Sequence, residues 1–287
     1  MTTDDVFTAH RPRLLGIAYG MLGAVGDAED VVQDAWLRWA DADHQAIRNP
    51  EAFLVTVTTR LAIDRLRSAR VRREEYVGPW LPEPLVADDE HDPADLVAEA
   101  EQLSLALLVT LEKLNPVERA VLLLRDVFDF EYAEIADAVA KSPANCRQIA
   151  VRAREHVRRP DRRHTPTAEE EHELLQAFLD AVLGRDVDRI RDLLAEDAVL
   201  WSDGGGVVQA ARKPVEGADL ISRFLVGIQK GGTPPDASFA WVRVNGEPGW
   251  RLRGTAFNSV WAFELAEGRI AAIRAVVNPD KLRHLAA

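Results

Sequence analysis

The spacing of apolar residues predicts helices through the first quarter of the chain. Between Val6 and Val71 apolar side chains recur every three or four residues, the period of a helix with one buried face. We expect Asp27 to cap the N-terminus of one such helix. Its buried stripe comprises Ala28, Val31, Val32, Ala35, Trp36 and Trp39. Asn49-Pro50 predicts another helix start, because proline at the first helical position lacks only a donor that has no partner there. The pattern predicts at least three helices packed as a small bundle.

Turn-forming residues interrupt the helical pattern after this bundle. The stretch from Tyr76 to Pro93 carries proline or glycine at five positions, which excludes a single helix and favours an extended tether. The overlapping stretch from Glu83 to Glu101 holds eight acidic residues and no lysine or arginine.

A helix-turn-helix pattern follows the acidic stretch. Asn115-Pro116 starts a helix, and Glu131 to Val139 has the apolar spacing of the next one. Ala140-Lys141 supplies a short turn, after which Ser142-Pro143 caps and opens a further helix. Two helices joined by so short a turn are typical of DNA-binding modules.

Beyond Thr165 helices give way to strands. Two amphipathic helices are predicted first, at Ala168 to Leu183 and at Val187 to Leu194. Runs with strand character follow at Ala198 to Trp201, Phe239 to Val244, Phe257 to Leu265 and Ile270 to Val277. Asn245-Gly246 and Glu267-Gly268 lie between such runs and favour hairpin turns. Helices followed by an antiparallel sheet predict a separate α+β domain.

Charge and composition narrow the function. The formal net charge of −12 argues against indiscriminate coating of nucleic acid, yet basic residues gather between Arg60 and Arg73 and again between Lys141 and Arg163. Two basic patches separated by an acidic connector indicate a protein that grips DNA at two places. No run of about 20 apolar residues and no leader pattern is seen, so we expect a cytoplasmic protein with no membrane partner. The single cysteine, Cys146, excludes an internal disulfide and argues against a metal site.

Two helix faces carry candidate binding residues. Opposite the first apolar stripe lie Asp30, Gln33, Asp34 and Leu37, an acidic ridge suited to a basic partner helix, although acids near a helix N-terminus also simply complement the helix dipole. On the last helix of the helix-turn-helix, Cys146 belongs to the inward stripe. The outward residues are Asn145, Arg147, Gln148 and Arg152, types that bond to base edges, with Arg158 and Arg159 placed for phosphates.

Two runs of sequence resemble extracytoplasmic-function sigma factors. The run from Asp27 to Trp39 (DAEDVVQDAWLRW) resembles the segment that binds the clamp helices of RNA polymerase, and NPEAFL from Asn49 resembles the following part of the same region two. The resemblance implies that the loop residues His44, Gln45 and Arg48 capture an unstacked base of the minus-ten element, with Arg60, Arg65 and Arg67 also on DNA. A merely polar loop is the alternative for any one of these side chains. LNPVERAVLLLR from Leu114 resembles region four, which reads the minus-thirty-five element.

Three short motifs resemble a narrower subgroup, the sigma factors with a SnoaL-like C-terminal extension. The motifs are YVGPWLPEP from Tyr76, DGGG from Asp203 and NPDKL from Asn278. The subgroup usually has lysine after the glycines, where this chain has Val207, which puts any contact of that lysine in doubt. We expect the motifs to meet, with the following interdomain residues in contact: Trp80, Leu81, Pro82, Asp203, Gly204, Gly205, Gly206, Asn278, Pro279, Asp280, Lys281 and Leu282.

The resemblance implies a multidomain chain of two all-α modules and a C-terminal α+β SnoaL-like cone domain. The predicted boundaries are 1–75 for region two, 76–95 for the connector, 96–163 for region four and 166–287 for the regulatory domain. The implied function is promoter-specific initiation: the chain binds core RNA polymerase and promoter DNA, while the C-terminal domain modulates activity intramolecularly. Two alternatives are a ligand-responsive helix-turn-helix regulator and a SnoaL-type enzyme fused to a DNA-binding module.

No catalytic set, cofactor or metal is expected from the sequence. Asp203, His172 and His284 are the acid–base candidates, and no spacing joins them into a site. The sequence leaves open the promoter sequence, the inducing signal, the sign of the regulation, the oligomeric state and whether the C-terminal pocket holds a small ligand.

Overall fold

The structure is a computed structural model that describes residues 3–87, 103–157, 167–229, 236–255 and 257–285. The chain divides into two compact units, one of Met1–Glu75 and Glu90–Arg159 and the other of Tyr76–Asp89 and Pro160–Ala287. Residues that follow the first three helices in sequence are therefore part of the C-terminal unit. Within the described ranges, no helix combines the length and the apolar character needed to cross a membrane.

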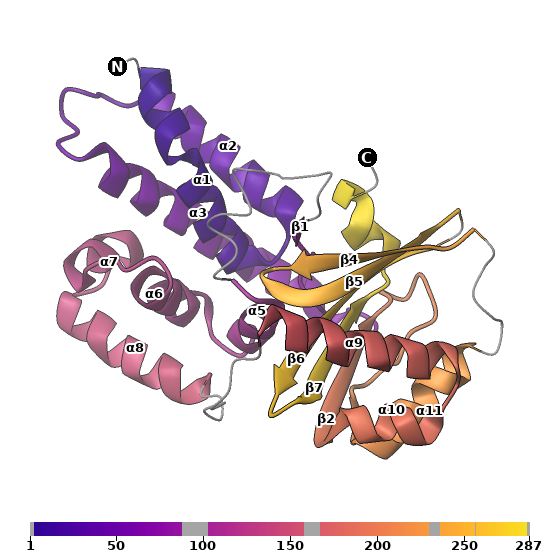
Figure 1. Ribbon diagram of the computed structural model, residues 1–287. Coiled ribbons are helices and arrows are strands. Elements are labelled where there is room, and N and C mark those ends of the chain that lie inside the picture. The colour runs from indigo at the N-terminus through magenta and orange to yellow at the C-terminus, as the bar shows by residue number, and fades with distance from the viewer. Residues whose placement is uncertain (1–2, 88–102, 158–166, 230–235, 256, 286–287) are drawn as a thin grey trace. The chain divides into compact units, whose positions relative to one another are not determined.

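The three helices predicted for the N-terminal part are present and pack on one another (Figure 1). They are α1 (Thr3–Leu22), α2 (Val25–Ala40) and α3 (Pro50–Glu74). Asn49 caps α3 as expected, its Oδ1 accepting from the Ala52 N–H at 3.2 Å. The prediction that Asp27 caps α2 is wrong, because the cap position is Ala24. Gly23 turns the chain directly after α1 with φ 65°, which lets α2 begin at the buried Val25.

Four further helices complete the helical unit in its described part: α5 (Leu105–Leu111), α6 (Pro116–Asp126), α7 (Tyr132–Val139) and α8 (Pro143–His156). Asn115 and Glu118 form a reciprocal capping box at the start of α6. Ala140 ends α7 in the left-handed conformation, and Ser142 caps α8. The predicted helix-turn-helix is therefore present as α7 and α8.

The C-terminal unit is a sheet with helices on one face. The strand order is β1-β4-β5-β6-β7-β2-β3, and every pair is antiparallel except β2 with β7. The strands are β1 (Val86–Ala87), β2 (Leu194–Asp203), β3 (Val215–Glu216), β4 (Ser238–Val244), β5 (Glu247–Gly254), β6 (Phe257–Ala266) and β7 (Arg269–Val276). The helices are α9 (Ala168–Leu183), α10 (Val187–Leu193) and α11 (Ala218–Ile228), and a 3₁₀ helix, η2 (Pro279–Leu285), follows β7.

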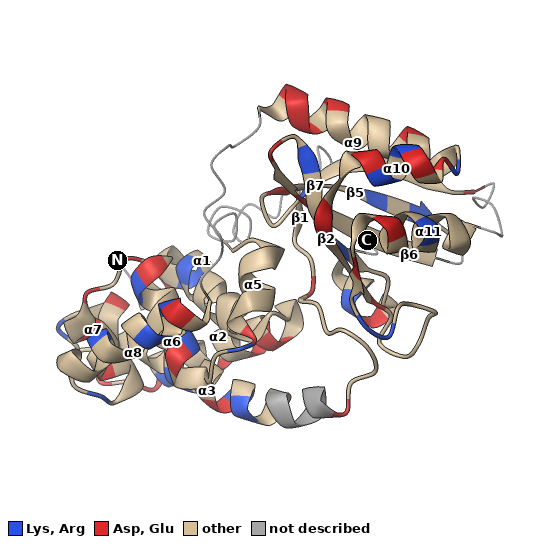
Figure 2. Cartoon of the chain, turned by 90° about the horizontal axis from the view of Figure 1, so that it is seen from below, with Lys and Arg blue, Asp and Glu red and all other residues tan. Residues whose placement is uncertain are grey.

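Large aromatic side chains fill the space between α9 and the sheet. Phe178 on α9 stacks on Trp250 of β5 at 6.0 Å between ring centroids, and Phe263 of β6 meets Trp250 edge-on at 4.4 Å. All three are buried, so this part of the cone is a packed core. Three glutamates occupy the first turn of α9, where they complement the positive end of the helix dipole (Figure 2).

Both predicted hairpin turns are present, but three strands, the two-residue β1 and β3 and the longer β5, and one α-helix escaped prediction. Asn245-Gly246 and Glu267-Gly268 adopt positive φ and join β4 to β5 and β6 to β7. Strand β5 was missed because Pro248 and Gly249 break the apolar alternation. Gly249 is required there, since a Cβ would lie 2.3 Å from the Trp261 carbonyl oxygen. Helix α11 was also unpredicted.

Candidate functional site

The outward face of α2 is acidic with an apolar edge. Asp30, Gln33, Asp34 and Leu37 are all exposed. Trp36, which we expected in the buried stripe, is also exposed, so that part of the prediction is wrong. At about 100° per residue Trp36 lies at the flank of the stripe rather than inside it.

An arginine of α3 reaches two acids of α2. The Arg65 guanidinium pairs with Asp27 at 2.7 Å and with Asp30 at 2.6 Å. These contacts, the hydrogen bond to Asp27 above all, raise the pKa of Arg65. Asp34 makes no such pair in the part of the chain that the structure describes. Asp34 therefore carries the uncompensated negative charge of this face.

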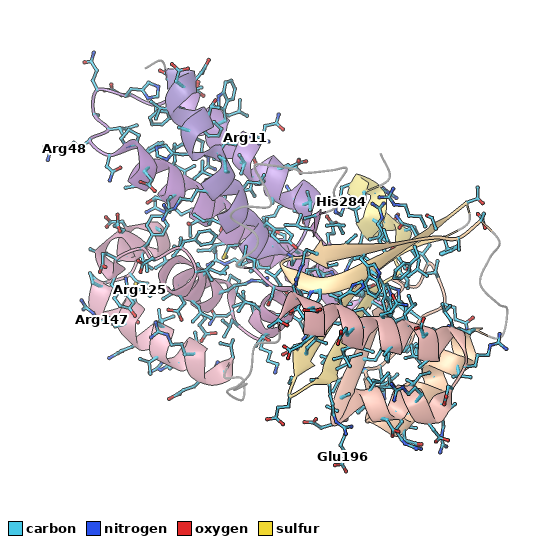
Figure 3. The ribbon with its side chains drawn as sticks, in the orientation of Figure 1. Arg11, Arg48, Arg125, Arg147, Glu196 and His284 are labelled. Carbon is cyan, nitrogen blue, oxygen red and sulfur yellow. The ribbon has the colours of Figure 1, made fainter. Side chains whose placement is uncertain are left out.

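The three predicted loop residues between α2 and α3 differ in their surroundings. His44 is half-buried, its ring edge-on to Trp39 at 4.4 Å between centroids. Gln45 and Arg48 are exposed, and Arg48 extends away from the helices (Figure 3). Two of the three side chains are thus free to meet a ligand.

The basic residues of α3 are partly occupied within the helical unit. Arg60 donates to the main-chain oxygens of Asp137 at 2.7 Å and Ala138 at 3.2 Å, near the C-terminal end of α7. Arg67 pairs with Asp64 at 2.9 Å and stays exposed. Arg67 is therefore more accessible to DNA than Arg60 or Arg65.

Helix α8 presents its predicted polar residues to solvent. Asn145, Arg147, Gln148 and Arg152 are exposed, while Cys146 is buried on the opposite face. Arg158 and Arg159 lie outside the described residues.

Tyr132, at the start of α7, contacts two arginines near α8. The sequence did not predict this role of Tyr132. The guanidinium carbons of Arg125 and Arg147 lie 5.2 and 5.3 Å from its ring centroid. Arg154 bonds to both carboxylate oxygens of Asp126, and this contact raises the pKa of Arg154. The arginines are thus held in place before any ligand arrives.

In the C-terminal unit, Asp203 at the end of β2 is the centre of a buried polar cluster. Its carboxylate accepts from the Tyr76 hydroxyl at 2.5 Å, the Leu81 N–H at 2.8 Å and the Lys281 ammonium at 2.7 Å. The Gly205 N–H adds a fourth bond at 3.1 Å. Asp203 is fully buried, and we call these five residues with Asn278 the Asp203 cluster.

Aromatic rings and glycines complete the Asp203 cluster. The Lys281 Nζ lies 4.2 Å from the Trp80 ring centroid and 4.8 Å from that of Tyr76, and it also donates to the Leu81 carbonyl oxygen. Asn278 donates to the Tyr76 hydroxyl at 2.9 Å. A Cβ on Gly205 would lie 2.1 Å from the Asn278 Nδ2, so only glycine fits. Burial, reinforced by Asp203, raises the pKa of Tyr76.

Further along, the chain from Leu81 to Ala87 is bonded to the edge of the sheet. The Leu85 N–H donates to the Asn245 Oδ1 at 2.9 Å, and the Asn245 N–H returns to the Leu85 carbonyl at 2.8 Å. Val86 and Ala87 then pair with β4 as strand β1. His284 meets the Pro84 carbonyl oxygen at 2.9 Å. The sequence predicted that the three motifs meet, and the structure brings Tyr76, Leu81, Asp203, Asn278 and Lys281 together.

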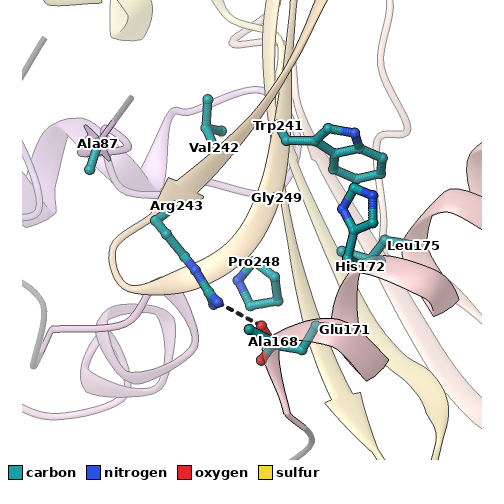
Figure 4. A pocket seen from close by; sticks show the side chains of 10 residues that line it. All are labelled: Ala87, Ala168, Glu171, His172, Leu175, Trp241, Val242, Arg243, Pro248 and Gly249. Atoms are coloured by element: carbon teal, nitrogen blue, oxygen red, sulfur yellow. Dashed lines mark hydrogen bonds and ion pairs between the residues drawn. The ribbon is translucent and has the colours of Figure 1, made fainter. Parts of the chain in front are cut away.

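A cavity of about 410 Å³ opens between the N-terminal half of α9 and the β4–β5 hairpin. Figure 4 shows His172 against Trp241 on one wall, with ring centroids 5.1 Å apart, and the Arg243–Glu171 ion pair, 2.7 Å long, at another. Leu175 and Pro248 add apolar surface. The acid–base candidates are dispersed: His172 lines this cavity, whereas Asp203 and His284 bond to the connector.

Known proteins are similar to this chain in both of its units. Residues 6–72 match the family model "Sigma-70 region 2", and residues 104–157 match "Sigma-70, region 4". The chain is 36% identical, over 96% of its length and 91% of the relative's, to the ECF RNA polymerase sigma factor SigJ of Mycobacterium tuberculosis. It is an extracytoplasmic-function sigma factor.

The similarity extends through the C-terminal domain. The crystal structure of Mycobacterium tuberculosis SigJ aligns with a TM-score of 0.79 and 34% identity, covering 96% of this sigma factor and 97% of that chain. A probable ECF sigma factor, SigI, of the same species is 30% identical over 97% of this chain and 94% of its own. The expected arrangement of two helical sigma regions followed by a C-terminal α+β domain is confirmed.

Membership of the family fixes the general function. This sigma factor directs promoter-specific initiation as an alternative sigma subunit, and the family implies core RNA polymerase and promoter DNA as its partners. The helices α1 to α3 are region two, and α5 to α8 are region four. The α2 face and the outward face of α8 thus lie on the two sigma regions.

Proposed function

We propose that the C-terminal domain regulates this sigma factor through the Asp203 cluster. The observation that carries the proposal is that residues 76–87, which lie in sequence between region two and region four, are built into the C-terminal domain. The two regions read separate promoter elements, so the free length of chain between them limits how they are spaced. A connector bonded into a folded domain has less free length than one released from it.

The buried ion pair of the Asp203 cluster makes release of the connector an all-or-none step. Asp203 is buried with four donors around it, and removing one partner of a buried ion pair typically costs about 3–5 kcal/mol. Loss of Lys281 would leave that carboxylate without its counter-charge. A ligand or partner protein that competes for these bonds would free the connector.

The substitution Lys281→Met tests the proposal, because it keeps the unbranched shape and most of the length of the side chain and removes its charge. We expect the variant to release the connector, seen as faster proteolysis near Trp80, and to change promoter-specific run-off transcription with core polymerase. Lys213→Met, at an exposed lysine of the same domain, is the matched control and should behave as wild type. Unchanged transcription from a variant with a released connector would contradict the proposal.

We also propose the surfaces used by the two partners. Asp30, Gln33, Asp34 and Leu37 bind core polymerase, supported by their shared exposure on α2. In region four, promoter DNA contacts the exposed residues Asn145, Arg147, Gln148 and Arg152, and also Arg158 and Arg159. In region two, it contacts the exposed residues Gln45, Arg48 and Arg67, together with His44, Arg60 and Arg65. The sigma factor then acts in the cytoplasm, where its polymerase is.

We further propose that the cavity beside α9 binds a small planar acid. The Trp241 ring on its wall favours a planar ligand, and Glu171 and the Gly246 carbonyl oxygen each take one N–H of the Arg243 guanidinium, leaving other N–H donors for a carboxylate. Indole-3-acetate is the probe, and 3-methylindole is its neutral match. We expect the acid alone to shift the indole N–H resonance of Trp241, and Arg243→Gln to abolish that shift. Equal shifts with both probes, or none, would contradict an acid site.

A further inference from the structure

Large exposed apolar side chains are confined to two places in the described part of the helical unit. Trp36 and Leu37 lie on α2, and Val151 lies on α8. Val151 is 54% exposed, the largest exposed fraction of the three. Single exposed apolar residues are common on protein surfaces, so exposure alone does not assign a role to Val151. Its position on the helix is the evidence for a role.

Val151 lies on the outward face of α8. Cys146, Ala150 and Ala153 are buried and define the inward face. Val151 is one helical turn beyond Arg147 and Gln148, which we assign to base recognition. Helix propensity does not favour valine here, because a β-branched residue in an exposed helix is less favourable than alanine by roughly 0.5 kcal/mol.

The side chains next to Val151 leave it uncovered. Arg147 precedes it by one turn and is held over the Tyr132 ring, while Arg154 follows it by one turn and is bonded to Asp126. Both long side chains are therefore anchored to other elements.

We propose that Val151 reads the 5-methyl group of a thymine in the upstream promoter element. On the major-groove edges of the bases that methyl is the apolar feature, and valine offers the matching surface. Four residues of helix rise about 6 Å, and successive base pairs are about 3.4 Å apart, so the thymine should lie within about two base pairs of the pair facing Arg147. The inference rests on DNA recognition by α8.

The test compares thymine with uracil, which lacks only that methyl group. Holoenzyme made from the full chain and core polymerase selects its upstream element from random DNA, and each thymine of the selected element is then replaced by uracil. At one position we expect the replacement to weaken wild-type binding about fourfold, the effect of one buried methyl group. Val151→Ala should bind thymine and uracil DNA equally there, with unchanged helicity.

A second aliphatic truncation is the control. Leu183→Ala removes an equally exposed side chain from α9, in the other unit, and should keep the wild-type ratio of thymine to uracil binding. The proposal is overturned if Val151→Ala keeps that ratio, if wild type tolerates every replacement, or if the variant loses affinity for core polymerase instead. If wild-type holoenzyme selects no upstream sequence at all, DNA recognition by α8 fails as well, which separates the two failures.

Discussion

A single buried carboxylate organises the junction between the connector and the C-terminal domain. The two oxygens of Asp203 accept four hydrogen bonds, from Tyr76, Leu81, Gly205 and Lys281. A carboxylate out of water needs such a shell, because each missing donor leaves part of the buried charge without a hydrogen bond. Residues distant in the sequence are thus held together by one side chain.

The Tyr76 hydroxyl makes the stability of this junction sensitive to high pH. Its pKa is raised, first by burial and then by Asp203, so the folded chain keeps the proton above pH 10, where an exposed tyrosine loses it. The stabilisation is therefore complete below about pH 10 and declines above it, by up to about 1.4 kcal/mol per pH unit.

We expect the stability advantage of wild type over Tyr76→Phe to be constant from pH 7 to 9 and to shrink at higher pH. Urea unfolding of both proteins at each pH measures it. Comparing the two proteins removes the titration of the other groups, which they share. An advantage that is equally large at pH 8 and pH 11 would show that the tyrosine proton is not held by the fold.

At the scale of elements, α2 has two unlike faces. The inward face packs on α1 and α3, and the outward face carries Asp30, Asp34 and Leu37 with the exposed Trp36. An exposed tryptophan and leucine beside acids resemble the centre of an interface, where apolar anchors sit inside a charged rim. Asp30 is partly neutralised by Arg65, so Asp34 gives the cleaner test.

We expect Asp34→Lys to weaken binding of core polymerase, because it reverses a charge on the surface that we propose binds a basic partner. Affinity measured at low and high salt should show the loss mainly at low salt, since salt screens exposed charges. Glu173→Lys makes the same reversal on an exposed site of α9 and should bind as wild type does. Undiminished binding by Asp34→Lys would remove α2 from the polymerase surface.

At the scale of the whole molecule, sequence order and structural units do not coincide. The chain leaves the helical unit after α3, passes through the C-terminal unit as residues 76–87, and later supplies α5 to α8 to the helical unit. The connector between the two sigma regions is therefore a structural part of the domain that we propose regulates the sigma factor.

We expect the connector to unfold with the C-terminal unit and not with the helical one. Amide hydrogen exchange tests this, since the Leu81 and Leu85 N–H groups are buried and bonded to Asp203 and Asn245. Their protons should exchange as slowly as those of β6 and β7. In Lys281→Met the Leu81 proton should exchange far faster while the strands stay protected. Fast exchange of Leu81 in wild type would mean that the cluster is open in solution.

The sequence by itself determined the elements whose signals are local. Apolar spacing and caps such as Asn49, Asn115 and Ser142 predicted helices, and Asn245-Gly246 predicted a hairpin, because these preferences depend on residues within a few positions. Motifs of consecutive residues likewise identified the sigma regions. Strand β5 could not be predicted in this way, because Pro248 and Gly249 are unfavourable in strands. These residues form a strand only because they pair with β4 and β6.

Only the tertiary structure decided which side chains are already engaged. Arg60 and Arg65 look like DNA ligands in the sequence, yet one binds main-chain oxygens near the end of α7 and the other binds Asp27 and Asp30. The roles of Tyr132 and Tyr76 and the exposure of Val151 likewise depend on neighbours that folding supplies. How far a charge or ring is available to a partner depends on the contacts that the fold gives it, and pairing between distant residues leaves no mark on local sequence.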